Sequence, residues 1–279
     1  MARALSIVAL AVLLIGCAAA GPTPDRPAAA PTIATTSETK PELEKYFDGQ
    51  PGTFVLYDLK RDHFLRYNPD RAAQRFLPAS TFKILNSLIS LETGVIPDEN
   101  TVIKWDGTPY DIPEWNQDHT MRTAIANSVV WYYQELARRV GKERMQKYVD
   151  AAGYGNHDIS GNIDSFWLDG ALRISANEQV EFLKRLYQDN LPFSQRNLHI
   201  VKDILVLEKT PVSQLSGKTG TQLRVKPSIN WFGGYVEKDG NVYIFATNLE
   251  LSEGDTSSTR AKETTQRILL DMGLIQSHQ

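Results

Sequence analysis

The chain has 279 residues, of which 42% are hydrophobic and 23% are charged, a composition typical of an ordinary globular protein of one or two domains. Its formal net charge of -3 and its lack of any run of basic residues argue against nucleic acid or an anionic membrane surface as the main partner. Any site for an anion must therefore be local.

The N-terminal segment has the features of an export signal. Arg3 precedes an apolar run over residues 5–15, which is too short to span a membrane, and small residues follow. The single cysteine, Cys17, excludes an intrachain disulfide and ends the sequence LIGC, which resembles the bacterial lipobox. That resemblance implies a signal peptide over residues 1–16 and a lipidated Cys17; cleavage after Ala20, which discards the cysteine, is the alternative. We expect an exported, periplasmic protein held to a membrane by this lipid.

Residues 17–45 are expected to form a flexible tether. The segment is rich in Pro, Ala and Thr and has few large apolar side chains, so burial cannot offset the entropy of ordering it. It contains one Ser-x-x-Lys pattern, from Ser37 to Lys40, which has no apolar helix behind it and which we interpret as a chance match. The folded domain is expected over residues 46–279.

A second Ser-x-x-Lys pattern stands at the beginning of an apolar helix. The helical period is strong over residues 82–91, which leave hardly any polar face, and Gly94 would end the helix. Residues three apart share a helical face, so Ser80 and Lys83 would lie side by side. A desolvated lysine amine is neutral more readily and can act as a base toward a hydroxyl. The pattern alone also arises by chance, so other motifs must support it.

The rest of the chain predicts strands at both ends and helices between them. Strands are expected in a hairpin over residues 52–68, in a single strand over 212–221 and in a hairpin over 229–250; helices are expected over 121–141, 142–153, 175–188 and 259–272. This order predicts an α+β fold, with an antiparallel sheet of about five strands flanked by terminal helices. An all-helical lobe would be inserted over roughly residues 82–205, and clefts form where such lobes meet.

Other common kinds of site have no support in the sequence. The five histidines show no HExxH or similar spacing, so no metal is expected. The chain has no GxSxG nucleophile motif and no phosphate-binding glycine loop, which argues against the usual hydrolase triad and against nucleotide binding.

Further motifs follow the Ser-x-x-Lys pair in order: SVV at Ser128, YGN at Tyr154, FWLDG and then GKTG at Gly217. Ser-x-x-Lys followed by a Lys-Thr-Gly strand is a known mark of penicillin-recognising serine enzymes. From about Gly52 to Leu274, the chain resembles the class D, or oxacillinase-type, serine β-lactamases. Several motifs in family order are far more specific than any one of them.

The resemblance implies a mechanism. Ser80 would attack the β-lactam carbonyl to form an acyl-enzyme, and the backbone N–H groups of Ser80 and Thr221 would form the oxyanion hole. Lys83 would be carboxylated by carbon dioxide, and this carbamate would be the base for acylation and deacylation; no other cofactor is implied. Ser128 would relay a proton to the lactam nitrogen. Trp167 would donate a hydrogen bond to the carbamate.

The resemblance also implies substrate contacts. The residues concerned are Val130, Lys218, Thr219, Gly220, Thr221 and Arg260. Among these, Lys218, Thr219 and Arg260 would meet the carboxylate that penicillins carry, with Arg260 as a forked donor. Val130 would cover the modified lysine.

Three residues near the expected site, Tyr154, Gly155 and Asn156, are interpreted as a structural turn rather than as catalytic groups. Two positions depart from the family pattern. Trp131 directly follows SVV, where a small residue or proline is common, and Asn230 precedes WFGG, where glycine is usual. Both changes would lie near the cleft wall, so the range of β-lactam substrates is left open.

Two other functions fit parts of the pattern. A β-lactam sensor shares the motifs and is acylated at the same serine without turnover, but it needs spanning helices, and the sequence beyond the export signal has no apolar stretch of about twenty residues. A non-enzymatic exported lipoprotein that binds small ligands would leave the STFK and GKTG motifs unexplained.

Overall fold

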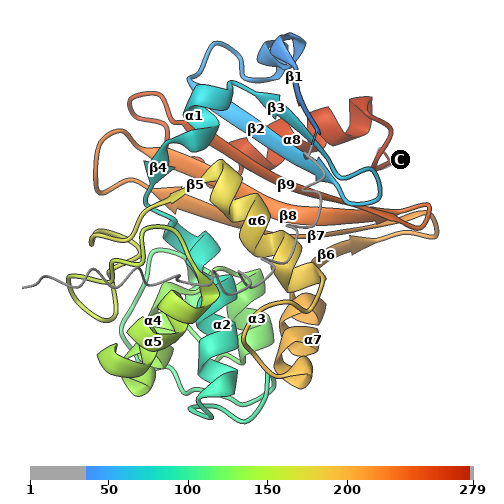
Figure 1. Ribbon diagram of the computed structural model, residues 1–279. Coiled ribbons are helices and arrows are strands. Elements are labelled where there is room, and N and C mark those ends of the chain that lie inside the picture. The colour runs from blue at the N-terminus through green and yellow to red at the C-terminus, as the bar shows by residue number, and fades with distance from the viewer. Residues whose placement is uncertain (1–35, 277–279) are drawn as a thin grey trace, which may run out of the picture. The chain divides into compact units, whose positions relative to one another are not determined.

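The computed structural model describes residues 36–276, whose centre is a seven-stranded sheet with the order β1-β3-β2-β9-β8-β7-β6 (Figure 1). The strands are β1 (Thr36–Thr39), β2 (Gly52–Asp58), β3 (His63–Tyr67), β6 (Val206–Lys209), β7 (Ser213–Gln222), β8 (Ile229–Lys238) and β9 (Asn241–Glu250). All neighbours in this sheet are antiparallel except β1 and β3, which are parallel. Two short strands, β4 (Arg75–Phe76) and β5 (Ile174–Ser175), pair separately.

The α+β class and both hairpins are confirmed, but the sheet has seven strands instead of about five. The two additional strands are four-residue edge strands, β1 and β6, which are too short to show a periodic sequence pattern. Residues 36–46, most of which were expected to belong to the tether, form a strand and a 3-10 helix. Thr36–Thr39 pairs with β3, and a 3-10 helix, η1 (Pro41–Tyr46), buries Leu43 and Tyr46.

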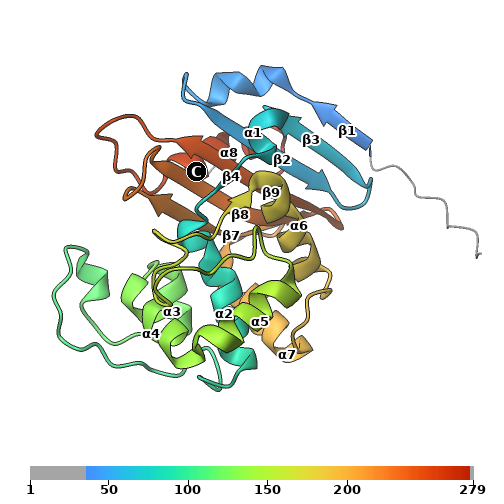
Figure 2. The same cartoon turned by 60° about the vertical axis from the view of Figure 1, so that its left-hand side comes forward.

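Both faces of the sheet are covered, which explains why all seven residues of β2 are buried. Along β8 the side chains alternate between two apolar cores: Trp231 and Tyr235 join the core shared with the central helices, while Phe232 and Val236 join the core under the C-terminal helix α8 (Arg260–Asp271). Figures 1 and 2 show α8 on one face of the sheet and α6 on the other.

The remaining helices are α1 (Pro69–Ala73), α2 (Lys83–Glu92), α3 (Met121–Ala126), α4 (Val130–Val140), α5 (Lys142–Ala152), α6 (Ala176–Tyr187) and α7 (Gln195–Ile204), with 3-10 turns at η2 (Ala79–Phe82) and η3 (Pro113–Trp115). A capping box is present at the start of α6, where Ser175 and Glu178 bond reciprocally. The single helix expected over residues 121–141 is wrong: it breaks into α3 and α4 at Ser128, whose φ is +53°. This break creates the loop that carries Ser128.

Within residues 36–276, no helix is long and apolar enough to cross a membrane. The same residues contain no group of three or more His, Cys, Asp or Glu side chains placed to hold a metal ion. The expected signal peptide and lipobox, with Cys17, lie outside the described residues.

Candidate active site

Ser80 lies in η2, directly before α2, and its side chain is buried except at one pocket. The turn is held by its neighbours: the Ala79 N–H donates to the Trp167 carbonyl at 3.0 Å, and the Thr81 hydroxyl donates to the Pro78 carbonyl at 2.7 Å. The Gln179 amide of α6 donates to the Thr81 hydroxyl at 2.7 Å. The serine is therefore presented on a rigid turn.

Lys83 is the first residue of α2 and is fully buried. Its Nζ donates to the backbone carbonyl of Ser128 at 2.6 Å and approaches the Ser128 Oγ at 3.0 Å. None of the ion pairs found in residues 36–276 includes Lys83. Burial, and then the positive charge of Lys218, hold the pKa of Lys83 well below its ordinary value, so the neutral amine is favoured.

Ser128 connects the two lysines. Its Oγ lies 3.0 Å from the Lys83 Nζ and 3.1 Å from the Lys218 Nζ. Burial, and then the charge of Lys262, lower the pKa of Lys218 to about 7. Since both amines are easily neutral, the Ser128 hydroxyl can exchange protons with either of them. Val130, at the start of α4, lines the same pocket as Ser128.

The GKTG strand approaches η2 closely at Gly220. A Cβ built on Gly220 would lie 2.9 Å from the Pro78 carbonyl oxygen and 3.2 Å from the Ser80 backbone nitrogen. These contacts are too short for any side chain, so only glycine lets β7 pass this close to Ser80. Lys218 and Thr221, on either side of Gly220, are thereby brought to the same pocket region.

The pocket has a volume of about 510 Å³. It is lined by most of the predicted catalytic and substrate-binding residues: Ser80, Ser128, Val130, Thr219, Gly220 and Thr221. It is also lined by residues that the sequence did not single out, namely Ile112, Trp115, Leu168, Gln222, Leu223, Arg224, Thr256 and Ser258. Most of these lie in loops, where no periodic pattern marks them.

Two interactions shape the rim of this pocket. Arg224, after β7, donates to the Asp169 carboxylate at 2.6 Å, and Asp169 lies in the FWLDG segment. The Trp131 indole donates to the Trp115 carbonyl at 2.9 Å and so supports a residue of the pocket wall. The unusual residue at Trp131 could therefore have indicated the position of this pocket wall. Nothing in the sequence indicated the ion pair between Arg224 and Asp169.

Trp167 is fully buried and stacks on Phe82, with 5.4 Å between ring centroids. Its indole Nε1 has no hydrogen-bond partner among the described residues. A buried N–H without a partner is costly, so this position is suited to an additional acceptor. The chemistry fits a carboxylated lysine, whose oxygens accept hydrogen bonds.

The YGN turn makes backbone contacts rather than pocket contacts. Tyr154 is buried and lies edge-on to Phe82, and Gly155 has a φ of +57°. A Cβ on Gly155 would lie 2.0 Å from the Arg173 carbonyl oxygen. The Asn156 side chain accepts a hydrogen bond from the Arg173 N–H at 2.8 Å and donates one to the Ala171 carbonyl at 3.0 Å. Such bonds to the backbone are typical of a residue that stabilises a turn.

Arg260 is not brought into the pocket, contrary to what the resemblance implied. It is the first residue of α8, and its side chain is 50% exposed and bonded through Nε to the Asp255 carboxylate at 3.1 Å. It lines a different hollow, here called the outer hollow, whose walls are Phe47, Asp48, Gln50, Arg260, Glu263, Thr264 and Arg267. The carboxylate partner explains why the guanidinium stays there.

Comparison with known proteins agrees with this geometry. Residues 41–270 match the penicillin binding protein transpeptidase domain family. β-Lactamase OXA-48 of Klebsiella pneumoniae is 49% identical over 204 residues, which are 73% of this chain and 77% of that protein. A solved class D β-lactamase from Nostoc has a TM-score of 0.81 at 47% identity, over 84% of this chain and 99% of that chain.

A regulatory protein is also related. BlaR1 of Bacillus licheniformis is 38% identical over 245 residues, which are 86% of this chain but 40% of that protein. The β-lactamases named above match this chain over most of their own length and at higher identity. With its motifs, its sheet and its serine–lysine pocket, the chain belongs to the class D serine β-lactamases of the penicillin-binding transpeptidase family.

Proposed function

We propose that the protein hydrolyses β-lactam antibiotics through an acyl-enzyme formed on Ser80. One observation carries the proposal: Ser80 shares a pocket with Ser128, whose Oγ lies within 3.1 Å of the amines of two buried lysines. A nucleophile beside a readily neutral amine is the arrangement that activates a hydroxyl.

In the first step, the Ser80 Oγ bonds to the lactam carbonyl carbon while its proton passes to the Lys83 side chain. The N–H groups of Ser80 and Thr221 hold the oxyanion, a role supported by the close approach of Gly220 to η2. The lactam C–N bond then breaks, and the Ser128 hydroxyl gives its proton to the nitrogen. Ser128 regains a proton from a neighbouring lysine.

In the second step, water attacks the ester carbon, loses a proton to the base and releases the product acid and the Ser80 hydroxyl. Lys218 and Thr219 face the carboxylate of the substrate from β7, while Val130 covers Lys83. The Lys218 Nζ lies 3.4 Å from the Thr219 Oγ1, so both groups can face the same carboxylate.

The reaction is tested with pure protein and a chromogenic cephalosporin. Continued turnover, with a transient adduct on the peptide that contains Ser80, is the expected result. Adduct that persists in Ser80→Ala would contradict the assignment. One equivalent of stable adduct without turnover would instead indicate the sensor function, which the similarity to BlaR1 keeps as the second candidate.

We further propose that Lys83 works as a carbamate. Three observations support it: the buried apolar setting of Lys83, its lowered pKa, and the indole Nε1 of Trp167, which lacks a partner among the described residues. Only a neutral amine combines with carbon dioxide, and the group so formed would supply carboxylate-type oxygens as the base. Trp167 would donate a hydrogen bond to this group, and Val130 would limit the entry of water.

The carbamate is tested by carbon-13 NMR in labelled bicarbonate. Trp167→Phe keeps an aromatic ring against Phe82 but loses the donor, so the bicarbonate needed for half-maximal activity should rise about tenfold. Trp231→Phe is the matched control, since that buried indole donates to the Leu77 carbonyl at 2.9 Å and should not affect bicarbonate dependence. Full activity of degassed wild type, without a carbamate resonance, would leave a plain neutral lysine as the base.

Export and anchoring rest on the sequence alone, and we propose them on that basis. The signal peptide would be removed before Cys17, and a lipid on this residue would hold the domain to a membrane through a tether that ends before residue 36. Sequencing of the mature protein distinguishes a lipid-blocked Cys17 from a free N-terminus at Gly21. Partition into detergent is expected only for the lipidated form.

A further inference from the structure

Gln222, the last residue of β7, faces the same side of the sheet as Ser80. Side chains along a strand alternate between its two faces, so Lys218, Gly220 and Gln222 share one face of β7. A Cβ on Gly220 would lie 3.2 Å from the Ser80 backbone nitrogen, which places Ser80 on this face. Gln222 pairs with Ile229 of β8, and Ile229 belongs to the apolar core shared with the central helices.

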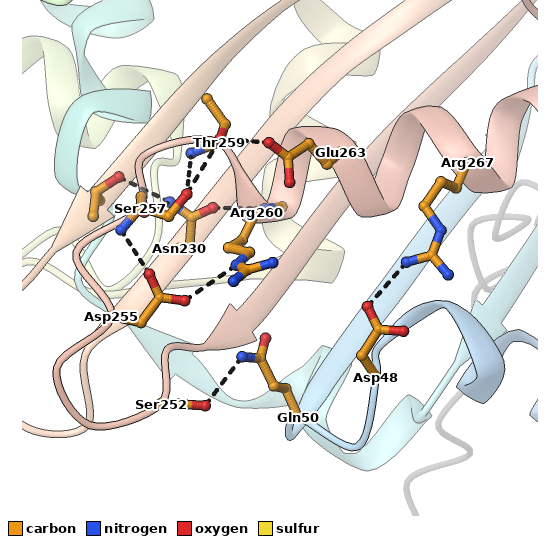
Figure 3. A network of polar contacts seen from close by, with 12 residues as sticks. Asp48, Gln50, Asn230, Ser252, Asp255, Ser257, Thr259, Arg260, Glu263 and Arg267 are labelled. Atoms are coloured by element: carbon orange, nitrogen blue, oxygen red, sulfur yellow. Dashed lines mark hydrogen bonds and ion pairs between the residues drawn. The ribbon is translucent and has the colours of Figure 1, made fainter.

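The opposite face of this strand end is held by Asn230, which lies in a network of hydrogen bonds beside α8 (Figure 3). Thr221, the residue before Gln222, accepts a hydrogen bond at its Oγ1 from the Asn230 Nδ2 at 2.8 Å. The Asn230 Oδ1 accepts from the Ala261 N–H of α8 at 2.6 Å. Because Asn230 is fully buried, these bonds fix the end of β7 to β8 and α8, and Gln222 is presented from a rigid strand.

The Gln222 amide is buried at the pocket and has an unpaired end. The residue is 4% exposed and lines the pocket of Ser80. Its Oε1 has no hydrogen-bond partner among residues 36–276. An amide can turn over, so either its oxygen or its nitrogen can occupy this buried position. Since an unpaired buried polar group is costly, the position is suited to a ligand group that can donate or accept a hydrogen bond.

The order of groups along β7 indicates which part of a β-lactam lies at Gln222. In the proposed reaction, Lys218 and Thr219 face the carboxylate, and the Thr221 N–H holds the lactam carbonyl oxygen. Gln222 lies beyond them, about 7 Å along the strand from Gly220. In penicillins and cephalosporins, the carboxylate lies on the nitrogen side of the lactam carbonyl, and the acylamino group is bonded to the carbon on the other side. The acylamino group therefore extends toward Gln222.

We propose that Gln222 is a substrate-binding residue that recognises the acylamino group of penicillins and cephalosporins. Its amide pairs with the amide of the substrate, either by accepting from the N–H or by donating to the C=O. This inference rests on the proposed β-lactam hydrolysis at the same pocket. It names the class of substrate that the pocket prefers, namely β-lactams with an amide on the carbon next to the lactam carbonyl.

The test measures amide selectivity, defined as the ratio of kcat/KM for benzylpenicillin to kcat/KM for penicillanic acid. Penicillanic acid has the same rings and carboxylate but no acylamino group. Gln222→Met keeps the length of the side chain and removes its hydrogen-bonding groups. It should lower amide selectivity about fivefold, the effect expected for loss of one neutral hydrogen bond.

Gln214→Met is the matched control on the same strand. The Gln214 amide donates to the Glu237 carboxylate at 2.7 Å, outside the pocket of Ser80, so amide selectivity should stay within about twofold of wild type. An unchanged ratio in Gln222→Met, or an equal loss in the two variants, would overturn the inference while leaving the proposed function intact. If wild type turns over neither compound, the proposed function itself fails.

The thermal stability of Gln222→Met separates binding from folding. Exchange of a buried polar group without a partner for an apolar group of the same length should not lower the melting temperature. A lower melting temperature together with equal losses of kcat/KM for both compounds would indicate a structural role and overturn the inference. If Gln222→Met does not fold, Gln222→Ala is measured in its place, and an unchanged amide selectivity in that variant would refute the role.

Discussion

The cations of the pocket and the cations of the outer hollow have opposite surroundings. Lys83 and Lys218 are 0% and 5% exposed, and their partners are hydroxyl and carbonyl oxygens. Arg260 and Arg267 are 50% and 48% exposed, and each is bonded to a carboxylate. Among the described residues, the pocket region buries lysine amines without a carboxylate partner, while the outer hollow exposes arginines and pairs each with a carboxylate.

The comparison explains which cations are chemically useful. Desolvation without a carboxylate partner favours a neutral amine, which can take a proton or combine with carbon dioxide. An exposed arginine with an ion pair stays charged and contributes mainly to the surface, where such pairs stabilise a protein little. The cationic side chains suited to catalysis in this protein are therefore those buried without a carboxylate partner.

The largest effect is expected from Lys83→Met, which fills the buried position with an apolar side chain of similar length. Loss of the general base should lower the rate of acylation by about a hundredfold to ten-thousandfold, as measured by single-turnover kinetics. Lys262→Met, on α8, should change the rate by far less. Equal losses in the two variants would mean that charge near the pocket, and not a base at Lys83, supports the reaction.

Gly220→Ala tests whether the pocket depends on the approach of β7 to η2. The added methyl group would lie 2.9 Å from the Pro78 oxygen and 3.1 Å from the Thr81 nitrogen, both backbone atoms that cannot move alone. We expect a loss of about 1–3 kcal/mol in the free energy of unfolding, measured by denaturant titration, and a lower kcat/KM.

Gly233→Ala is the matched control on the neighbouring strand. Its nearest contact would be the end of the Leu183 side chain at 3.3 Å, which can give way. The control should retain most of both stability and activity. If Gly220→Ala were as mild as this control, β7 would not be positioned by its contact with η2.

The pH dependence of stability tests the burial of Lys218. Its pKa is about 7 in the folded protein and 10.5 as the ordinary value, so the unfolded chain binds more protons between these limits. The free energy of unfolding should therefore rise with pH from about 7 to 9, by at most about 1.4 kcal/mol per pH unit.

The measurement is the difference in slope between wild type and Lys218→Met, because buried tyrosines with raised pKa values oppose the trend in more alkaline solution. The variant should lose the contribution of Lys218. Parallel slopes would mean that Lys218 is protonated in the fold and has a counterion that the described residues do not provide.

The sequence predicted the parts of the site that lie in ordered motifs. Ser80 and Lys83 were placed at the beginning of an expected apolar helix, and Gly220 on an expected strand. The break at Ser128 was missed because its apolar neighbours continue a helical pattern, whereas in the structure Ser128 has a positive φ and α3 packs against α4. Local propensity cannot encode such a tertiary constraint.

The direction of Arg260 could not be predicted for a related reason. The motif gives the position of the residue on α8, but the direction of its side chain depends on Asp255 and on the hydrogen bonds of Asn230, which come from a loop and from another strand. The short edge strands β1 and β6 were likewise invisible to periodic analysis. In each case, residues distant in the sequence determine the conformation, and the local sequence alone is compatible with more than one.

The smallest effect is expected for the ion pair between Arg224 and Asp169 at the pocket rim. Arg224 is 58% exposed and bonds Asp169, itself 37% exposed, at 2.6 Å. By exposure and partner it resembles the outer arginines, although it lines the pocket of Ser80. A double-mutant cycle with Arg224→Ala and Asp169→Ala should give a coupling of about 0.2–1 kcal/mol in the free energy of unfolding.

The same cycle measured in kcat/KM decides whether this pair also has a role in function. If location in the pocket is less important than burial, the functional coupling should be as small as the coupling in stability and should weaken in high salt, since both charges are screened by water. Arg138 and Asp164, an exposed pair at 2.8 Å away from the pocket lining, provide the control cycle. Exposed pairs do not reach a functional coupling above about 2 kcal/mol. Such a coupling would show that an exposed, paired arginine also contributes to catalysis at this pocket. Burial without a carboxylate partner would then not be the only property that makes a cationic side chain functional here.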